Sequence, residues 1–202
     1  SDGGEDKVWG GNGGDAIATG DQDDKVWGGS GGDAIAGEAG DDKLHGDDGD
    51  DAIAGGLDED TLKGGFGNDA LSGSDDDDKL WGEHGNDAMS GGNDEDSLKG
   101  GFGNDTLAGG TDDDKIVGGE GDDSLLGGTG DDKIWSLDGE EDTLRGGDGN
   151  DKFFVDDGDY IADADGNDKV VGQDDCCDLE TKLLYGHELL LGKLESRLAY
   201  IG

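Results

Sequence analysis

Seventeen aspartates recur along the chain at a spacing of nine residues, and a large apolar residue follows each of them two positions later. Carboxylate oxygens are the ligands that hard divalent cations prefer. A regular series of them therefore points first to metal binding. The spacing is broken once, by one inserted residue before Asp142. The series is Asp6, Asp15, Asp24, Asp33, Asp42, Asp51, Asp60, Asp69, Asp78, Asp87, Asp96, Asp105, Asp114, Asp123, Asp132, Asp142 and Asp151.

The apolar residues keep the same period, and a fixed period of this kind determines the fold before local propensities do. One apolar residue per nine predicts one inward-facing side chain per repeat. The series is Val8, Ile17, Val26, Ile35, Leu44, Ile53, Leu62, Leu71, Leu80, Met89, Leu98, Leu107, Ile116, Leu125, Ile134, Leu144 and Phe153.

Counted from Gly10 as position one, the repeat reads G-G-x-G-x-D-x-U-x, where U is apolar, as in residues 28–36 and 127–135. This pattern resembles the nonapeptide of the RTX (repeats-in-toxin) family, and the resemblance covers residues 1–154 of 202. It implies an all-β fold, a right-handed parallel β-roll (β-solenoid) that binds calcium. Such rolls accompany proteases, lipases, toxins, epimerases and adhesins, so the resemblance implies no single activity.

The repeat also has a direct structural interpretation. Glycines at positions one to six allow tight turns, and positions seven to nine form a very short strand with position eight pointing inward. Two repeats then make one coil of eighteen residues. Stacked coils pair their strands about 4.8 Å apart, and their turns form two columns, one along each edge of the roll.

A column of carboxylates at this spacing repels itself strongly. Calcium between successive turns relieves the repulsion because it accepts six to eight carboxylate and carbonyl oxygens, whereas magnesium requires a smaller octahedral shell. Seventeen turns in two columns make about 15 stacked pairs, which predicts about 15 calcium ions. These ions would change the net charge from −41 to about −11, which suits a soluble domain.

The composition supports a fold that depends on metal. The chain has 55 acidic and 14 basic residues, 46 glycines and only 29% hydrophobic residues, which alone is typical of a disordered chain. The periodicity and the composition agree if the chain folds only when a cation binds. The free energy of cation binding then supplies the free energy of folding. We expect affinities in the weak extracellular range, about 10⁻⁴–10⁻³ M. The net charge argues against nucleic acid or an anionic membrane as the native partner.

Some turns depart from the pattern. Position four of alternate repeats carries Gln22, Asp58, Asp76, Asp94 or Asp112 in place of glycine. Aspartate tolerates the left-handed conformation, so these turns either survive as looser sites or recruit an extra carboxylate. The ten-residue segment 136–145 has Glu140 where the turn glycine belongs, which predicts a bulge or a damaged site.

An eighteen-residue period gives the two outward faces different characters. Alternate repeats carry small residues at positions seven and nine, from Ala16 and Ala18 to Thr106 and Ala108; the others carry pairs such as Lys7 and Trp9. The small-residue face is either a surface for self-association or partner packing, or a neutral exposed filler. The aromatics either stabilise cross-strand pairs or contact sugars and neighbouring lysines. Interruptions at His45, Lys63 and Lys99 make the aromatic column discontinuous.

Two further surface features bear on binding. Regular Thr or Asn ranks, which ice binding would require, are absent at position three. Phe66 and Phe102 occupy equivalent turns two coils apart and could form a contact spot.

The repeat decays after residue 154, which predicts a β-roll at 1–154 and capping strands with an amphipathic tail at 155–202. A cap protects the open sheet end, and Asp165 and Asp168 could add one ion site. The tail repeats leucines at helical spacing. It is a cap, a degenerate repeat or, by resemblance, an uncleaved export signal.

Cys176 and Cys177 are adjacent and are either two free thiols or an intermolecular disulfide.

No catalytic centre is predicted. His45, His84 and His187 have no second group placed to form a triad or a zinc site, and aspartates bound to calcium make poor acids or bases. The sequence shows no signal peptide or membrane-spanning segment, and it begins within a repeat without Met, as a fragment or processed form would.

We expect a secreted or cell-surface calcium-binding roll, exported by type I secretion, with a structural or interaction role and possible assembly into homo-oligomers. The alternative is an accessory module of a larger secreted enzyme or toxin. A third hypothesis is an ice- or glycan-binding adhesin module.

Overall fold

The strands of this protein alternate between exposed and buried residues. In the computed structural model, which describes residues 4–164 and 166–172, a typical strand has an exposed residue at position seven, a buried one at position eight and a half-buried one at position nine. This two-residue period is that of a strand with one face in the core.

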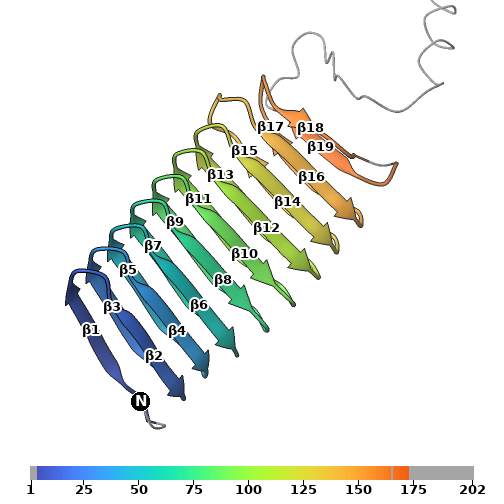
Figure 1. The fold of residues 1–202 in the computed structure, drawn as a ribbon. Coiled ribbons are helices and arrows are strands. Elements are labelled where there is room, and N and C mark those ends of the chain that lie inside the picture. The colour runs from blue at the N-terminus through green and yellow to red at the C-terminus, as the bar shows by residue number, and fades with distance from the viewer. Residues whose placement is uncertain (1–3, 165, 173–202) are drawn as a thin grey trace, which may run out of the picture.

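The strands form two parallel sheets (Figure 1), and successive strands alternate between them. The first sheet has ten strands: β1 (Lys7–Asn12), β3 (Lys25–Ser30), β5 (Lys43–Asp48), β7 (Thr61–Phe66), β9 (Lys79–His84), β11 (Ser97–Phe102), β13 (Lys115–Glu120), β15 (Lys133–Ser136), β17 (Lys152–Val155) and β19 (Lys169–Gly172).

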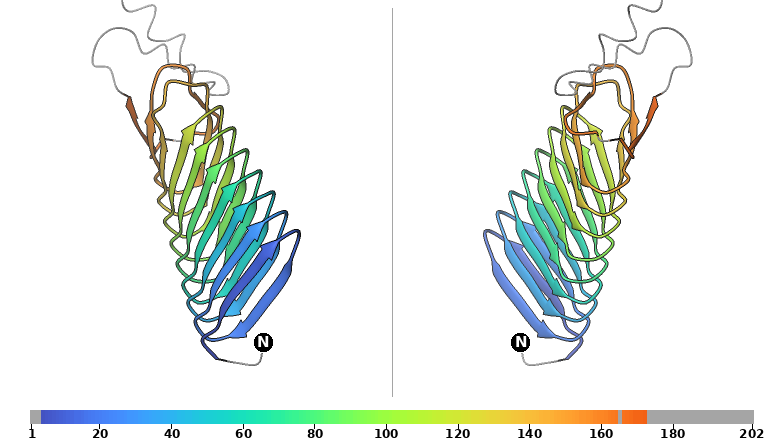
Figure 2. Two further views of the ribbon diagram at one scale, coloured as in Figure 1. Left: turned by 90° about the vertical axis from the view of Figure 1, so that its left-hand side faces the viewer. Right: turned by 90° about the vertical axis from the view of Figure 1, so that its right-hand side faces the viewer.

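The second sheet has nine strands and lies against the first (Figure 2). They are β2 (Ala16–Asp21), β4 (Ala34–Ala39), β6 (Ala52–Leu57), β8 (Ala70–Ser74), β10 (Ala88–Gly92), β12 (Thr106–Thr111), β14 (Ser124–Thr129), β16 (Thr143–Asp148) and β18 (Tyr160–Ile161).

The pairing register confirms the eighteen-residue coil. Lys7 pairs with Lys25, and Ala16 pairs with Ala34. Each residue therefore lies beside its equivalent in the next coil, and this is the parallel β-roll predicted from the period.

The core is one side chain wide. It contains the position-eight residue of each strand from Val26 to Phe153, together with Val155, and these side chains are at most 8% exposed. Val8 and Ile17 in the first coil are only partly buried. Because each strand buries one large apolar residue, the hydrophobic contribution to stability is small for the length of the chain.

The strands are longer than predicted. Most have six residues and continue through positions one to three of the next repeat, so His84 ends β9 and is not in a turn. Coils superposed in register bring these positions within hydrogen-bonding distance of the next coil as well. Glycine at position two permits this with positive φ, as at Gly29 (φ 109°).

At the C-terminal end, β18 and β19 extend the two sheets by pairing with β16 and β17. The predicted tail, with Cys176, Cys177 and His187, lies outside the described residues. None of the described segments forms a helix of the length and hydrophobicity needed to cross a lipid bilayer.

Two adjacent leucines test the thin core. Leu125 is 1% exposed and Leu126 is 41% exposed. We expect Leu125→Ala to lower the free energy of unfolding by about 2–5 kcal/mol, and Leu126→Ala to change it by less than about 1 kcal/mol. Urea unfolding of both variants in the same calcium-containing buffer measures this. Equal effects would mean that position eight is not the core.

Candidate metal centres in the turns

The repeated aspartates lie in two columns, one along each edge of the roll. The first column runs from Asp15 to Asp159, and the second runs from Asp6 to Asp168. Within a column, each aspartate after the first accepts a hydrogen bond on Oδ1 from the backbone N–H of the aspartate one coil earlier; for Asp87 and Asp105 the donors are Asp69 and Asp87, both at 2.8 Å. One carboxylate oxygen of each repeat is thus committed to stacking the turns.

The second oxygen of these carboxylates has no such role. Within the described residues, Oδ2 is buried without a hydrogen-bond partner in sixteen of the seventeen predicted aspartates. A buried oxygen without a partner costs desolvation free energy that nothing in the protein offsets. The sixteen are Asp15, Asp24, Asp33, Asp42, Asp51, Asp60, Asp69, Asp78, Asp87, Asp96, Asp105, Asp114, Asp123, Asp132, Asp142 and Asp151.

These oxygens lie against the position-one glycine of the same repeat. A Cβ atom added to Gly10 would lie 2.6 Å from Asp15 Oδ2 and 2.5 Å from the carbonyl oxygen of Gly28, in the next coil. Gly82 has the same surroundings, between the carboxylate of Asp87 and the carbonyl oxygen of Gly100. The φ angle of Gly82 is not in the left-handed region. Glycine is therefore required here because there is no room for a Cβ atom, and not because of the backbone conformation. A carboxylate oxygen and a carbonyl oxygen therefore converge in each of these turns.

Burial disfavours the ionised form of these carboxyls. Burial raises the pKa of Asp60 and Asp114 to about 8, and that of Asp69 and Asp105 to about 7, from an ordinary value of 3.8. Hydrogen bonds from the preceding aspartate's backbone lower the pKa, but burial dominates, and neighbouring carboxylates raise it further. At neutral pH a cation would remove this cost.

The donor set fits calcium. Within the described chain, no group of three or more His, Cys, Asp or Glu side chains is placed to hold an ion. A site must therefore combine one or two carboxylates with backbone carbonyl oxygens. Calcium accepts such all-oxygen shells with flexible geometry, whereas zinc requires nitrogen or sulfur ligands in a tetrahedron.

The sequence comparison agrees with this geometry. The family model for the RTX calcium-binding nonapeptide repeat matches residues 1–26, 27–62, 63–98, 99–134 and 137–162. The chain belongs to the RTX calcium-binding nonapeptide repeat family. RTX nonapeptide repeats bind calcium. A comparison with characterised proteins gives no significant match.

The RTX roll tolerates the irregular turns. The non-glycine residues at position four adopt positive φ, from 73° at Asp58 to 81° at Gln22. Asp58 and Asp76 are exposed, and their carboxylates accept hydrogen bonds from position four of the coil before, Gly40 and Asp58 respectively. The structure thus favours turns that survive without an extra carboxylate aimed at the ion space.

The insertion at 136–145 forms a bulge before Asp142. Strand β15 stops at Ser136, and the carboxylate of Asp138 accepts a hydrogen bond from the backbone of Gly121. Asp142 still accepts the hydrogen bond from Asp123 at 2.7 Å. The column of carboxylates continues past the bulge.

Sequence reasoning missed three features of these columns. Position one is Thr19 and Ser136 at two turns; the Thr19 hydroxyl donates to the carbonyl oxygen of Gly37 at 3.1 Å. Asp159 extends the first column by accepting the backbone N–H of Asp142 at 3.2 Å. The sequence signal for Asp159 is the Asp-x-apolar triplet of residues 159–161, which lies one residue earlier than the nine-residue period from Asp151 requires. Asp168, which was predicted to add a site, extends the second column in the same way.

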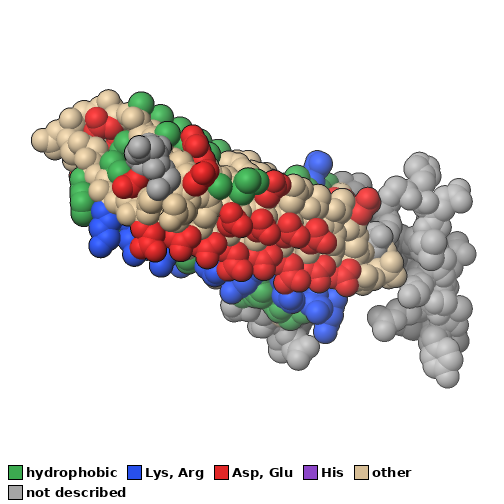
Figure 3. Space-filling view, turned by 90° about the horizontal axis from the view of Figure 1, so that it is seen from below, with side chains coloured by type: hydrophobic (Ala, Val, Ile, Leu, Met, Phe, Trp, Pro, Cys, Tyr) green, Lys and Arg blue, Asp and Glu red, His purple; other side chains and the backbone are tan. Residues whose placement is uncertain are grey.

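Other acidic side chains also gather along the roll. In the view from below (Figure 3), exposed acids form rows along the molecule, with lysines beside them. These rows add negative potential near the turns. A surface that carries one sign of charge raises the local concentration of counter-ions, which here are cations.

One variant tests the ligand assignment. Asp87→Asn retains an oxygen that can accept the hydrogen bond from Asp69 but loses the charge. We expect the number of bound calcium ions, counted by native mass spectrometry, to fall by about one or two, because each carboxylate borders its own turn and the next. Asp48→Asn, at an exposed position outside the columns, serves as the control. Equal loss in both variants would contradict the assignment.

The raised pKa values predict an acid-stabilised metal-free roll. Because the folded-state pKa of Asp60 and Asp114 is about 8 and the ordinary value is 3.8, the folded state binds more protons than the unfolded chain between these values. This contribution to stability is fully present below the unfolded pKa and is lost as the pH rises through 7–8. Circular dichroism of metal-free protein should show more β-structure at pH 5 than at pH 8, and the reverse trend would refute the argument.

Proposed function

We propose that this chain is a secreted calcium-binding β-roll that folds when it binds calcium and then serves a structural or interaction role. The observation that carries the proposal is the series of sixteen buried carboxylate oxygens without hydrogen-bond partners in the described residues. A core one side chain wide gives the chain little other means to offset this cost. Ion binding then supplies much of the folding free energy.

The ligands in this proposal are the seventeen repeated aspartates, from Asp6 to Asp151, with backbone carbonyl oxygens of the turns. About 15 ions follow from the stacked pairs that they form. Asp159 and Asp168 add one link to each column and are proposed as ligands of the terminal sites.

Calcium-dependent folding also supports an extracellular location. Sites of weak affinity stay empty at the calcium concentration of a cytosol, so the chain would remain unfolded there and fold after export. Type I secretion, to the medium or the cell surface, is the route that we propose.

The alternative function is that of an accessory module in a larger secreted enzyme or toxin, where the roll aids export and calcium-triggered folding. The division of the chain into a roll at 1–154 and a cap with a tail at 155–202 serves either function. We assign no catalytic step to any residue of the chain.

Self-association is the interaction role that the small-residue face supports. On the second sheet, Ala16, Ala34, Ala52 and Ala70 align across four strands, with Ala18, Ala36 and Ala54 beside them. They surround a shallow hollow of about 440 Å³. Small side chains allow close approach of another surface.

Sedimentation velocity with and without calcium tests folding and association together. We expect a slow, expanded chain without calcium and a compact particle with it, because the ions neutralise the turns. If the alanine face associates, the sedimentation coefficient rises with protein concentration only in calcium, and Ala36→Lys abolishes this rise. Val117→Lys, on the opposite sheet, is the matched control. A sedimentation coefficient that calcium does not change would refute calcium-triggered folding.

A further inference from the structure

An aromatic ladder runs along the outward face of the first sheet. Position nine of successive strands carries Trp9, Trp27, His45, Lys63, Trp81, Lys99, Val117, Trp135 and Phe154. Where rings are neighbours they stack: Trp9 on Trp27 at 5.0 Å between centroids, and Trp135 on Phe154 at 4.7 Å with an angle of 2° between the planes. The flat faces of these rings therefore point along the axis of the roll.

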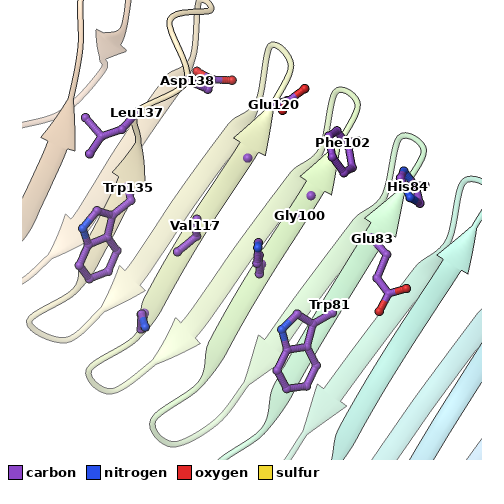
Figure 4. Close-up of a pocket in the computed structure, with 14 residues that line it drawn as sticks. Trp81, Glu83, His84, Gly100, Phe102, Val117, Glu120, Trp135, Leu137 and Asp138 are labelled. Atoms are coloured by element: carbon purple, nitrogen blue, oxygen red, sulfur yellow. The ribbon is translucent and has the colours of Figure 1, made fainter.

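The ladder has a gap of two strands between Trp81 and Trp135, where Lys99 and Val117 take the place of rings (Figure 4). This gap is a groove of about 1050 Å³. Three strand spacings separate the two indoles, which is about 14 Å. The ammonium group of Lys63 lies over the Trp81 ring from the strand before it, so the other face of the ring is turned toward the groove.

The groove combines apolar faces with charges of both signs. Phe102 and Leu137, which are 48% and 44% exposed, line it together with Glu120, Asp138 and Lys115. The Lys115 ammonium group lies over the Trp135 ring, 5.6 Å from its centre, from the strand on the groove side, and Phe154 stacks on the ring from the other side. The free indole face that borders the groove is therefore that of Trp81. At one corner His84 stacks between Phe66 and Phe102, at 4.6 and 4.8 Å between ring centroids, and the His84 and Phe102 rings border the groove.

We propose that the groove between Trp81 and Trp135 binds a neutral oligosaccharide. The C–H faces of sugar rings pack on indole faces, and interspersed carboxylates and ammonium groups accept from and donate to hydroxyl groups. Lys99 and Lys115 face three acids, Glu83, Glu120 and Asp138, so the lining mixes both signs and carries a formal net charge of only about −1. This balance, on a chain of net charge −41, selects against an anionic ligand and offers no uniform acidic surface to a cationic one. The inference rests on the proposed calcium-dependent folding, because the groove exists only on the stacked roll.

The test is isothermal titration calorimetry of the calcium-loaded protein with three linear neutral probes: cellohexaose, maltohexaose and chitohexaose. An oligogalacturonate of the same length is the anionic probe. We expect at least one neutral probe to bind and the anionic probe to bind more weakly. Trp81→Ala should weaken the binding of that probe about tenfold, because it removes the indole face that is turned toward the groove. Trp135→Ala should weaken it less, because Phe154 and Lys115 already cover the two faces of that ring.

Two further variants make the result specific. Trp27→Ala removes an indole from the same ladder outside the groove and should leave the affinity unchanged. Val117→Trp adds a ring beside Trp135, fills the groove and should abolish binding while the roll still folds, because it continues the stack.

Circular dichroism of every variant in calcium separates the two proposals. If the unaltered chain folds in calcium but binds none of the neutral probes, or if Trp27→Ala weakens binding as much as Trp81→Ala, the groove is not a glycan site and the calcium-binding function stands. If the chain does not fold in calcium, both proposals fail.

Discussion

Each turn of the roll depends on one carboxylate whose two oxygens have different tasks. Oδ1 accepts a hydrogen bond from the neighbouring coil and fixes the stacking, as at Asp87. Oδ2 is buried against a glycine and has no hydrogen-bond partner in the described protein. The interaction that stacks the coils therefore creates a cost that a bound cation removes. Under the proposed function, folding and metal binding are a single equilibrium, because the carboxylate and carbonyl oxygens converge only between stacked turns.

The same stacking repeats every surface residue at the spacing of one strand. Lysines lie beside lysines along the first sheet and alanines beside alanines along the second. A roll thereby converts an eighteen-residue sequence period into long, uniform faces. Where one or two repeats depart from the period, the face changes only at those strands. The groove at Lys99 and Val117 is such a feature, since it arises where two aromatic residues are missing from a column.

Most of the fold was predictable because the period is constant. One aspartate and one apolar residue in every nine determine the coil length, the inward residue and the two columns of turns. The strand length was not predictable, since pairing through positions one to three depends on the superposition of whole coils. Thr19 and Ser136 were missed because the requirement for glycine at position one is one of space between two coils. Asp159 was missed because the repeat shifts phase at the C-terminal end, and the groove because it is defined by side chains eighteen residues apart.

The most direct measurement of the central claim is anomalous X-ray diffraction from calcium-loaded crystals at a wavelength where calcium scatters anomalously. The account predicts two rows of peaks, one along each edge of the roll, with each peak next to an aspartate Oδ2 and a glycine carbonyl oxygen of the next coil. Weaker peaks are expected beside Thr19 and Ser136. Turns without peaks in calcium-loaded crystals, or peaks confined to the exposed acids, would contradict it.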